Sequence, residues 1–104
     1  MSNSFRGEIE ATIGGERRTL CLTLGALGEL ETRMQAGDLQ GLAERLSSQR
    51  ISARDLVAIL GAGLRGGGAR LSDEEIEAMP IEGGLKGAAE IVARLLHATF
   101  GEGS

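Results

Sequence analysis

Apolar and polar residues alternate along positions 5–24, and this alternation predicts a two-stranded antiparallel hairpin. Gly14 and Gly15 lie at its centre, where a two-residue turn requires positive φ angles that glycine adopts without strain. A turn at this point pairs Ile13 with Glu16. Continued outward, the register predicts one apolar face, made of Phe5, Ile9, Leu20, Leu22 and Leu24. Because a lone hairpin is marginally stable in water, we expect this face to lie on helices.

Beyond position 23 the apolar spacing changes to the three- and four-residue steps that are typical of amphipathic helices. The pattern predicts helices over residues 24–36, 39–46, 53–65, 73–79 and 85–100. Suitable N-cap residues precede the first four, namely Thr23, Asp38, Ser52 and Ser72. We therefore expect one mostly helical α+β domain over residues 1–104, with an antiparallel hairpin packed on four to five helices. Its predicted parts are a loose tail at 1–4, the hairpin at 5–23 and a helical part at 24–100.

The last predicted helix has an unusually wide apolar arc, which spans roughly 220° at 100° per residue. A one-sided surface helix needs only about 100° or somewhat more. The helix is therefore either central in the domain or covered in part by another subunit, and we favour the central position. Its apolar residues include Leu85, Ala88, Ala89, Ile91, Val92, Ala93, Leu95, Leu96, Ala98 and Phe100.

The third predicted helix places small residues between two arginines on the side away from its leucines. A flat face of this kind permits a partner to pack closely, although an ordinary solvated face is the simpler interpretation. Together with part of the last helix it forms our candidate partner-binding surface, made of Arg54, Ala58, Gly61, Ala62, Arg65, Ile91, Leu95 and Ala98.

The net charge of −4 is unevenly distributed along the chain. Residues 45–70 contain five arginines and one aspartate, hence 5 − 1 = +4, so the remainder carries −8. A basic middle with acidic ends suits self-association or an acidic protein partner, and solvated arginine is the alternative. The first ten residues lack an apolar signal-peptide core, and no stretch approaches about 20 apolar residues. We therefore expect a cytoplasmic protein that does not enter membranes.

The chain offers little catalytic chemistry, with one histidine, one cysteine, no tyrosine and no tryptophan. His97 falls on the polar side of the last helix, and no second histidine or cysteine exists to complete a metal site around it. Cys21 has no histidine nearby in sequence to activate it. The paired carboxylates lie on the exposed hairpin face or at a helix start, so we expect no enzyme activity and no cofactor.

The glycines at 61, 63 and 66 match the spacing of a dinucleotide-binding loop. However, the apolar run before them begins at the Ser52 helix cap, whereas the nucleotide motif follows a strand. Nucleic-acid binding through the arginines is also remote, because the arginine-rich residues 45–70 include no aromatic residue to stack on bases. Both remain distant alternatives to a protein-binding role.

A series of short motifs gives a more specific indication of function. In order along the chain they are Arg6-Gly-Glu-Ile-Glu, Gly15-Glu-Arg-Arg, Leu22-Thr-Leu-Gly-Ala-Leu-Gly-Glu-Leu-Glu31, Ala53-Arg-Asp-Leu, Ala62-Gly-Leu-Arg-Gly-Gly-Gly68 and Glu82-Gly-Gly84. This ordered set resembles the gene transfer agent tail protein family of alphaproteobacteria, whose members are small phage-tail proteins. One difference is Leu85, which stands where members of the family often have proline after the paired glycines.

The resemblance implies a role in building a phage tail, and two roles are attached to the family. One is a tail-assembly chaperone that coats the tape-measure protein and helps to recruit tube subunits; the other is a component of the tail tube, within the virion-like particle. Tube walls are generally built from extensive β-sheet, whereas this chain predicts one hairpin and several helices with apolar faces. We therefore favour the chaperone, with the tape-measure protein, tube subunits and other copies of the chain as expected partners.

Overall fold

The computed structural model describes residues 7–47 and 51–101 and confirms a mostly helical α+β fold. Residues 1–4, predicted as a loose tail, and Phe5 lie outside the described residues. The elements are β1 (Ile9–Ile13), β2 (Glu16–Leu20), α1 (Leu24–Arg33), α2 (Leu39–Ser47), α3 (Ala53–Gly66), α4 (Asp73–Glu77) and α5 (Gly84–Phe100).

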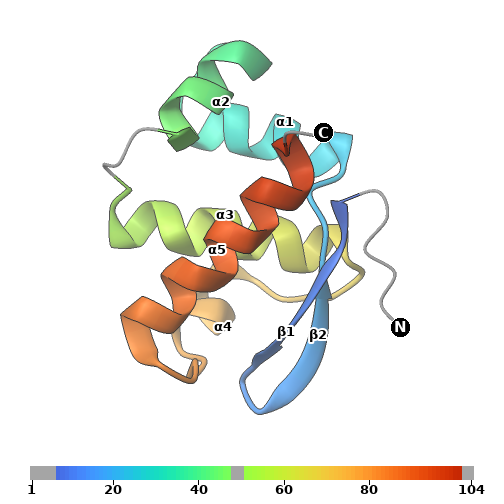
Figure 1. The fold of residues 1–104 in the computed structure, drawn as a ribbon, viewed down its shortest axis with the longest axis vertical. Helices are drawn as coiled ribbons and strands as arrows, with labels where there is room; N and C mark the ends of the chain where they lie inside the picture. Colours follow the sequence, from blue (N-terminus) through green and yellow to red (C-terminus); the bar gives the residue numbers. More distant parts are fainter. Residues whose placement is uncertain (1–6, 48–50, 102–104) are drawn as a thin grey trace.

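Helix α3 is the element around which the others are arranged. It contacts α1, α4, α5 and β2, while α2 packs on α1 and the hairpin reaches α5 through β1. Figure 1 shows α5 crossing α3, with the hairpin beside both helices and α2 above them. The side chains of Ile59 and Leu64 on α3 are fully buried. The core therefore lies along α3, where aliphatic side chains from the helices and the hairpin meet.

The hairpin has the register that its turn glycines predicted. Ile13 pairs with Glu16 and Ile9 with Leu20. Both turn glycines have positive φ, at 66° and 82°. The Gly14 N–H also donates a 3.0 Å hydrogen bond to the carbonyl of Pro80, which ties the turn to the segment after α4.

The predicted apolar face of the hairpin is confirmed at Leu20 and Leu22, which are buried, and at Ile9, which is partly buried, but it is wrong at Leu24. The ladder stops at the Ile9–Leu20 pair, short of the predicted bounds of 5–23. Leu24 is 81% exposed instead of buried. The reason is local, because the Thr23 hydroxyl accepts a hydrogen bond from the Ala26 N–H and so makes Leu24 the first residue of α1.

The other predicted helix caps are present. Ser52 and Ser72 each form a reciprocal capping box with the residue three positions later, and Asp38 accepts a 2.8 Å bond from the Gly41 N–H. Helix α1 ends at Arg33, three residues before the prediction, and Gln35 adopts a left-handed φ of 54°. Helix α4 ends at Glu77, two residues before the predicted Met79.

Glycines in the second half of α3 allow the hairpin strand to approach the helix backbone. The Cys21 N–H donates a 2.9 Å hydrogen bond to the carbonyl of Gly63. A Cβ added at Gly66 would lie 2.0 Å from the Cys21 carbonyl oxygen, and one at Gly63 would lie 2.7 Å from Leu95 Cδ2. The motif that resembles a nucleotide-binding loop therefore lies inside a helix, and its glycines serve close packing.

Candidate protein-binding groove

The predicted binding face of α3 does not lie on the surface. Ala58 and Ala62 are 4% and 0% exposed, and Gly61 is buried as well. Because α1, α4, α5 and β2 all pack on α3, the small side chains face the interior of the domain. The prediction that this face is exposed and flat is therefore wrong. Arg54 is exposed, and its contact with a partner stays a prediction.

Arg65 lies in an ion-pair cluster that joins three helices. Its guanidinium contacts Glu29 of α1 and Asp73 of α4, and it donates a 2.9 Å hydrogen bond to the Leu71 carbonyl. Arg33 of α1 contacts the same two carboxylates, with its guanidinium 3.6 Å from Glu29, one helical turn earlier. Arg65 was expected to face a partner, but its charge is compensated within the chain.

The cluster changes the acidity of its carboxylate on α4. Burial raises the pKa of Asp73, but the hydrogen bonds and positive charges of Arg33 and Arg65 outweigh that effect and hold the pKa below its ordinary value. Arg45 in turn pairs with Asp55 and donates to the Met34 carbonyl, whereas Arg50 lies outside the described residues. Two of the five arginines in the predicted basic middle, Arg45 and Arg65, therefore have acidic partners within the chain.

Helix α5 is not enclosed by the domain, contrary to the favoured prediction. One part of its apolar arc is buried against α3 and β1, and that part includes the predicted surface residues Ile91 and Leu95. The neighbouring part is open, with Leu85 68% exposed and Phe100 41% exposed. The wide arc thus combines a core face with a surface stripe, made of Leu85, Ala89, Ala93, Leu96 and Phe100. Their spacing of four, four, three and four places them on one helix face.

This stripe forms one wall of an apolar groove. A cavity of about 440 Å³ lies between α5 and the start of α3, where Ile51 and Leu56 form the opposite wall. A second cavity of about 510 Å³ lies between α5 and α2. Leu46 and Leu96 line both, so the two cavities adjoin. From Leu85 to Phe100 the groove follows α5 for roughly 22 Å at 1.5 Å per residue.

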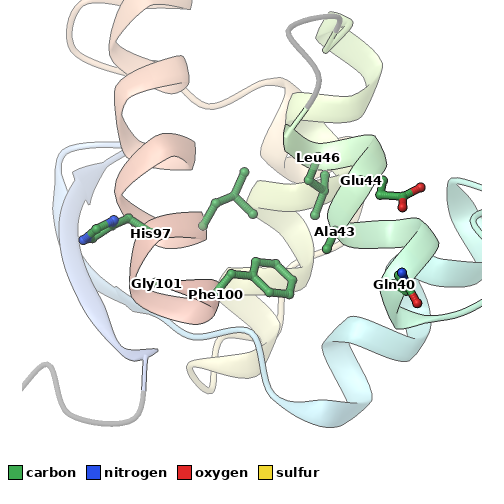
Figure 2. Close-up of a pocket in the computed structure, with 8 residues that line it drawn as sticks. Gln40, Ala43, Glu44, Leu46, His97, Phe100 and Gly101 are labelled. Carbon is green, nitrogen blue, oxygen red and sulfur yellow. The ribbon is translucent and has the colours of Figure 1, made fainter. Parts of the chain in front are cut away.

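Figure 2 shows the end of the groove between α5 and α2. Phe100 projects from α5 toward Ala43, while the imidazole of His97 points away from α2. Gln40 and Glu44 supply polar groups at the α2 side. The groove thus combines an apolar floor with a polar rim, which is the usual composition of a protein-binding surface.

The remaining candidate groups lie outside the groove. Cys21 lines a separate cavity beside α1, together with the predicted surface residue Ala98. Burial, and then the negative charge of Glu8, raise the pKa of the Cys21 thiol. Within residues 7–47 and 51–101 no polar or charged side chain is fully buried, and no three metal-ligating side chains lie together. In the same ranges, every helix is too short or too polar to cross a bilayer.

Comparison with known protein families shows which family the chain belongs to. A family model described as phage tail tube protein, GTA-gp10, matches residues 6–102. The chain belongs to this family. The resemblance carried by the sequence motifs is thereby confirmed, and a structural role in a phage tail is supported. No curated protein and no solved structure matches the chain.

Membership of the GTA-gp10 family sets the general kind of partner. A tail protein of this type contacts other tail proteins or further copies of itself, either in the particle or during assembly. The sequence contained the signal for the α5 stripe, because all five residues were part of the predicted arc. What the sequence lacked was any indication of which part of the arc the domain itself would cover.

Proposed function

We propose that this GTA-gp10 family protein is a tail-assembly chaperone, and that its groove binds a helical segment of the tape-measure protein in the cytoplasm. The observation that carries the proposal is the open apolar groove along α5, about 22 Å long. That length accommodates roughly 15 residues of a partner helix, or about four turns. Binding of an amphipathic helix in an apolar groove is a common recognition mode.

The small size of the sheet favours the chaperone over a tube subunit. The described residues contain one two-stranded sheet, with five residues in each strand. A tube wall built from sheets needs long strands that continue between subunits, whereas a chaperone needs apolar helix surface. The tube subunit is the second candidate, and the description of the family favours it.

Co-expression with a helical fragment of the tape-measure protein tests the groove directly. We expect the two proteins to co-purify, and the Ala93→Glu variant to lose the fragment. Ala93 is exposed in the middle of the groove, so a carboxylate there meets the apolar face of the bound helix without disturbing the core. Ala78→Glu is the matched control, since Ala78 is exposed after α4 and does not line the groove. Equal recovery of the fragment by both variants would exclude this surface.

Mass spectrometry of purified tails separates the two roles. A chaperone leaves the particle after assembly, so its peptides should be absent from mature tails. A tube subunit is present in many copies and should rank among the most abundant proteins. Abundant peptides of this chain in mature tails would therefore favour the tube role.

A further inference from the structure

The exposed stripe on α5 has small side chains in its middle and large ones at both ends. Ala89 and Ala93 are exposed near the centre, whereas Leu85 and Phe100 are exposed at the two ends. Figure 1 shows α5 crossing in front of α3, on one face of the domain. Because both alanines are exposed, a second helix can approach the backbone of α5 at this point from outside the domain.

This order of sizes matches the shape of two crossed helices. Packed helices lie about 8–10 Å apart, and they are closest where they cross and diverge toward their ends. The alanines permit a close approach at the crossing point, and the large side chains fill the wider space at the ends. The stripe is therefore suited to one other helix that crosses α5 near Ala93.

The stripe is complementary to itself when two copies run antiparallel. The midpoint between Leu85 and Phe100 falls next to Ala93, so a two-fold axis there brings the two copies of Ala93 together. Leu85 then faces Phe100 of the second copy, and Ala89 faces Leu96 of the second copy. A parallel pair would instead place Ala89 against Ala89 and leave a gap. The described residues that line the adjoining cavity of about 440 Å³ are all apolar, so this contact buries no unpaired charge.

We propose that, in the absence of a helical partner, two copies of this chain associate through the α5 stripe in an antiparallel, two-fold arrangement. A second copy is also an occupant that the family supports, since its members contact other tail proteins or further copies of themselves. The dimer covers the groove, so a helix of the tape-measure protein must displace the second copy before it binds. That displacement rests on the proposed function, whereas the dimer itself does not.

The extent of the stripe makes the dimer weak. A helix face about 22 Å long and about 10 Å wide covers roughly 220 Å², whereas a stable interface buries about 800 Å² on each partner. Interfaces of that standard size already range from micromolar to picomolar, so we expect a Kd in the micromolar range or weaker. A dimer of this strength exchanges readily, and a partner that binds more tightly can replace one copy.

Sedimentation equilibrium measures the association directly, with interference optics because the chain has no tryptophan or tyrosine. Between about 1 μM and about 1 mM we expect the mean mass to rise from one chain toward two. Ala93→Glu should stay monomeric, because two carboxylates would meet at the two-fold axis. Ala78→Glu, exposed and outside the stripe, should associate like the parent protein. A parent protein that is monomeric at every concentration would overturn the proposal.

Two substitutions of opposite charge test the antiparallel arrangement. Leu85→Glu and Phe100→Lys should each weaken self-association by about tenfold or more. An equimolar mixture of the two variants should associate again, because the new carboxylate faces the new ammonium group while Leu85 and Phe100 still meet at the other end. A mixture that associates no better than either variant alone would refute this geometry.

Addition of the tape-measure fragment separates the dimer from the proposed function. We expect the fragment to bind one chain and the dimer to disappear. A monomeric protein that binds the fragment would overturn the dimer and leave the proposed function standing. A dimer that does not bind the fragment would do the reverse, and a complex that keeps both chains would refute the shared surface.

Discussion

The close approach of β2 to α3 leads to a sharp prediction for two glycine-to-alanine variants. Gly66 ends α3, and a Cβ there would lie 2.0 Å from the carbonyl oxygen of Cys21. The oxygen belongs to the backbone, so it cannot move aside as the end of a flexible side chain can. Gly28 is the matched control, because it is an exposed position inside α1 where an added Cβ has no neighbour within 4 Å.

The free-energy cost of Gly66→Ala follows from how far the helix and the chain at Cys21 must move apart to admit the added Cβ. A comfortable carbon–oxygen contact is about 3.3 Å, so the strand and the helix must separate by about 1.3 Å. That movement breaks the 2.9 Å hydrogen bond from the Cys21 N–H to the Gly63 carbonyl. The lost bond costs about 1–3 kcal/mol and the displaced packing about 1–3 kcal/mol, while alanine returns at most about 1 kcal/mol of helix propensity. We expect a net loss of about 3 kcal/mol, or about 12–24 °C in Tm.

Gly28→Ala should have the opposite sign. It gains helix propensity without a new contact, which raises the free energy of unfolding by up to about 1 kcal/mol. Both variants can be followed by far-UV circular dichroism during urea unfolding, since the chain has no tryptophan for fluorescence. A Gly66→Ala protein as stable as the parent would show that α3 and β2 are not held at this distance, and our account of the glycines would be refuted.

Three further predictions concern the ion-pair cluster, the hairpin turn and the cysteine. Asp73→Asn should lower the free energy of unfolding by about 1–3 kcal/mol at pH 7, because Arg33 and Arg65 lose a charged partner. Folding lowers the pKa of Asp73. The contribution of Asp73 to the free energy of unfolding is therefore fully present above the ordinary carboxyl pKa of about 3.9, and it is lost as the pH falls through the lower pKa of the folded state. Urea unfolding from pH 7 to pH 2 should therefore show a weaker acid dependence in the variant, and identical curves would contradict this role. Gly15→Ala should cost about 1–2 kcal/mol through its φ of 82° alone, as no atom lies within 4 Å of the added Cβ; an unchanged urea midpoint would contradict it. The raised pKa of Cys21 should make its alkylation by iodoacetamide at pH 8 slower in the folded protein than in urea, and equal rates would show an unhindered thiol.

Local chemistry explains which parts of the fold could be predicted from the sequence. The turn glycines determine the hairpin register, because few other residues adopt positive φ at two adjacent positions. Thr23, Ser52 and Ser72 mark helix starts through hydrogen bonds that span three residues. These features depend on neighbours in sequence, so a reading of the chain identifies them correctly.

Features that depend on contacts between distant residues could not be predicted in this way. Ala58 and Ala62 are small because other elements pack closely on α3, yet small residues also suit an exposed flat face. Arg65 finds Glu29 from 36 positions away, which no local pattern reveals. The sequence indicates how wide the apolar arc of α5 is, but not which part of that arc the rest of the domain covers. The predicted surface on α3 and α5 therefore includes residues that the domain itself covers, such as Ala62 and Leu95, and its role in partner binding stays a prediction.

The groove also has a consequence for the order of events during synthesis. The walls of the groove come from α2, the start of α3 and α5. The groove therefore forms only after α5, at residues 84–100, has been synthesised and has packed on the earlier helices. A chain still on the ribosome, with α5 not yet emerged, therefore has no site for a partner. If the groove is the partner site, a copy without a folded α5 cannot occupy a partner there and block a copy that has one.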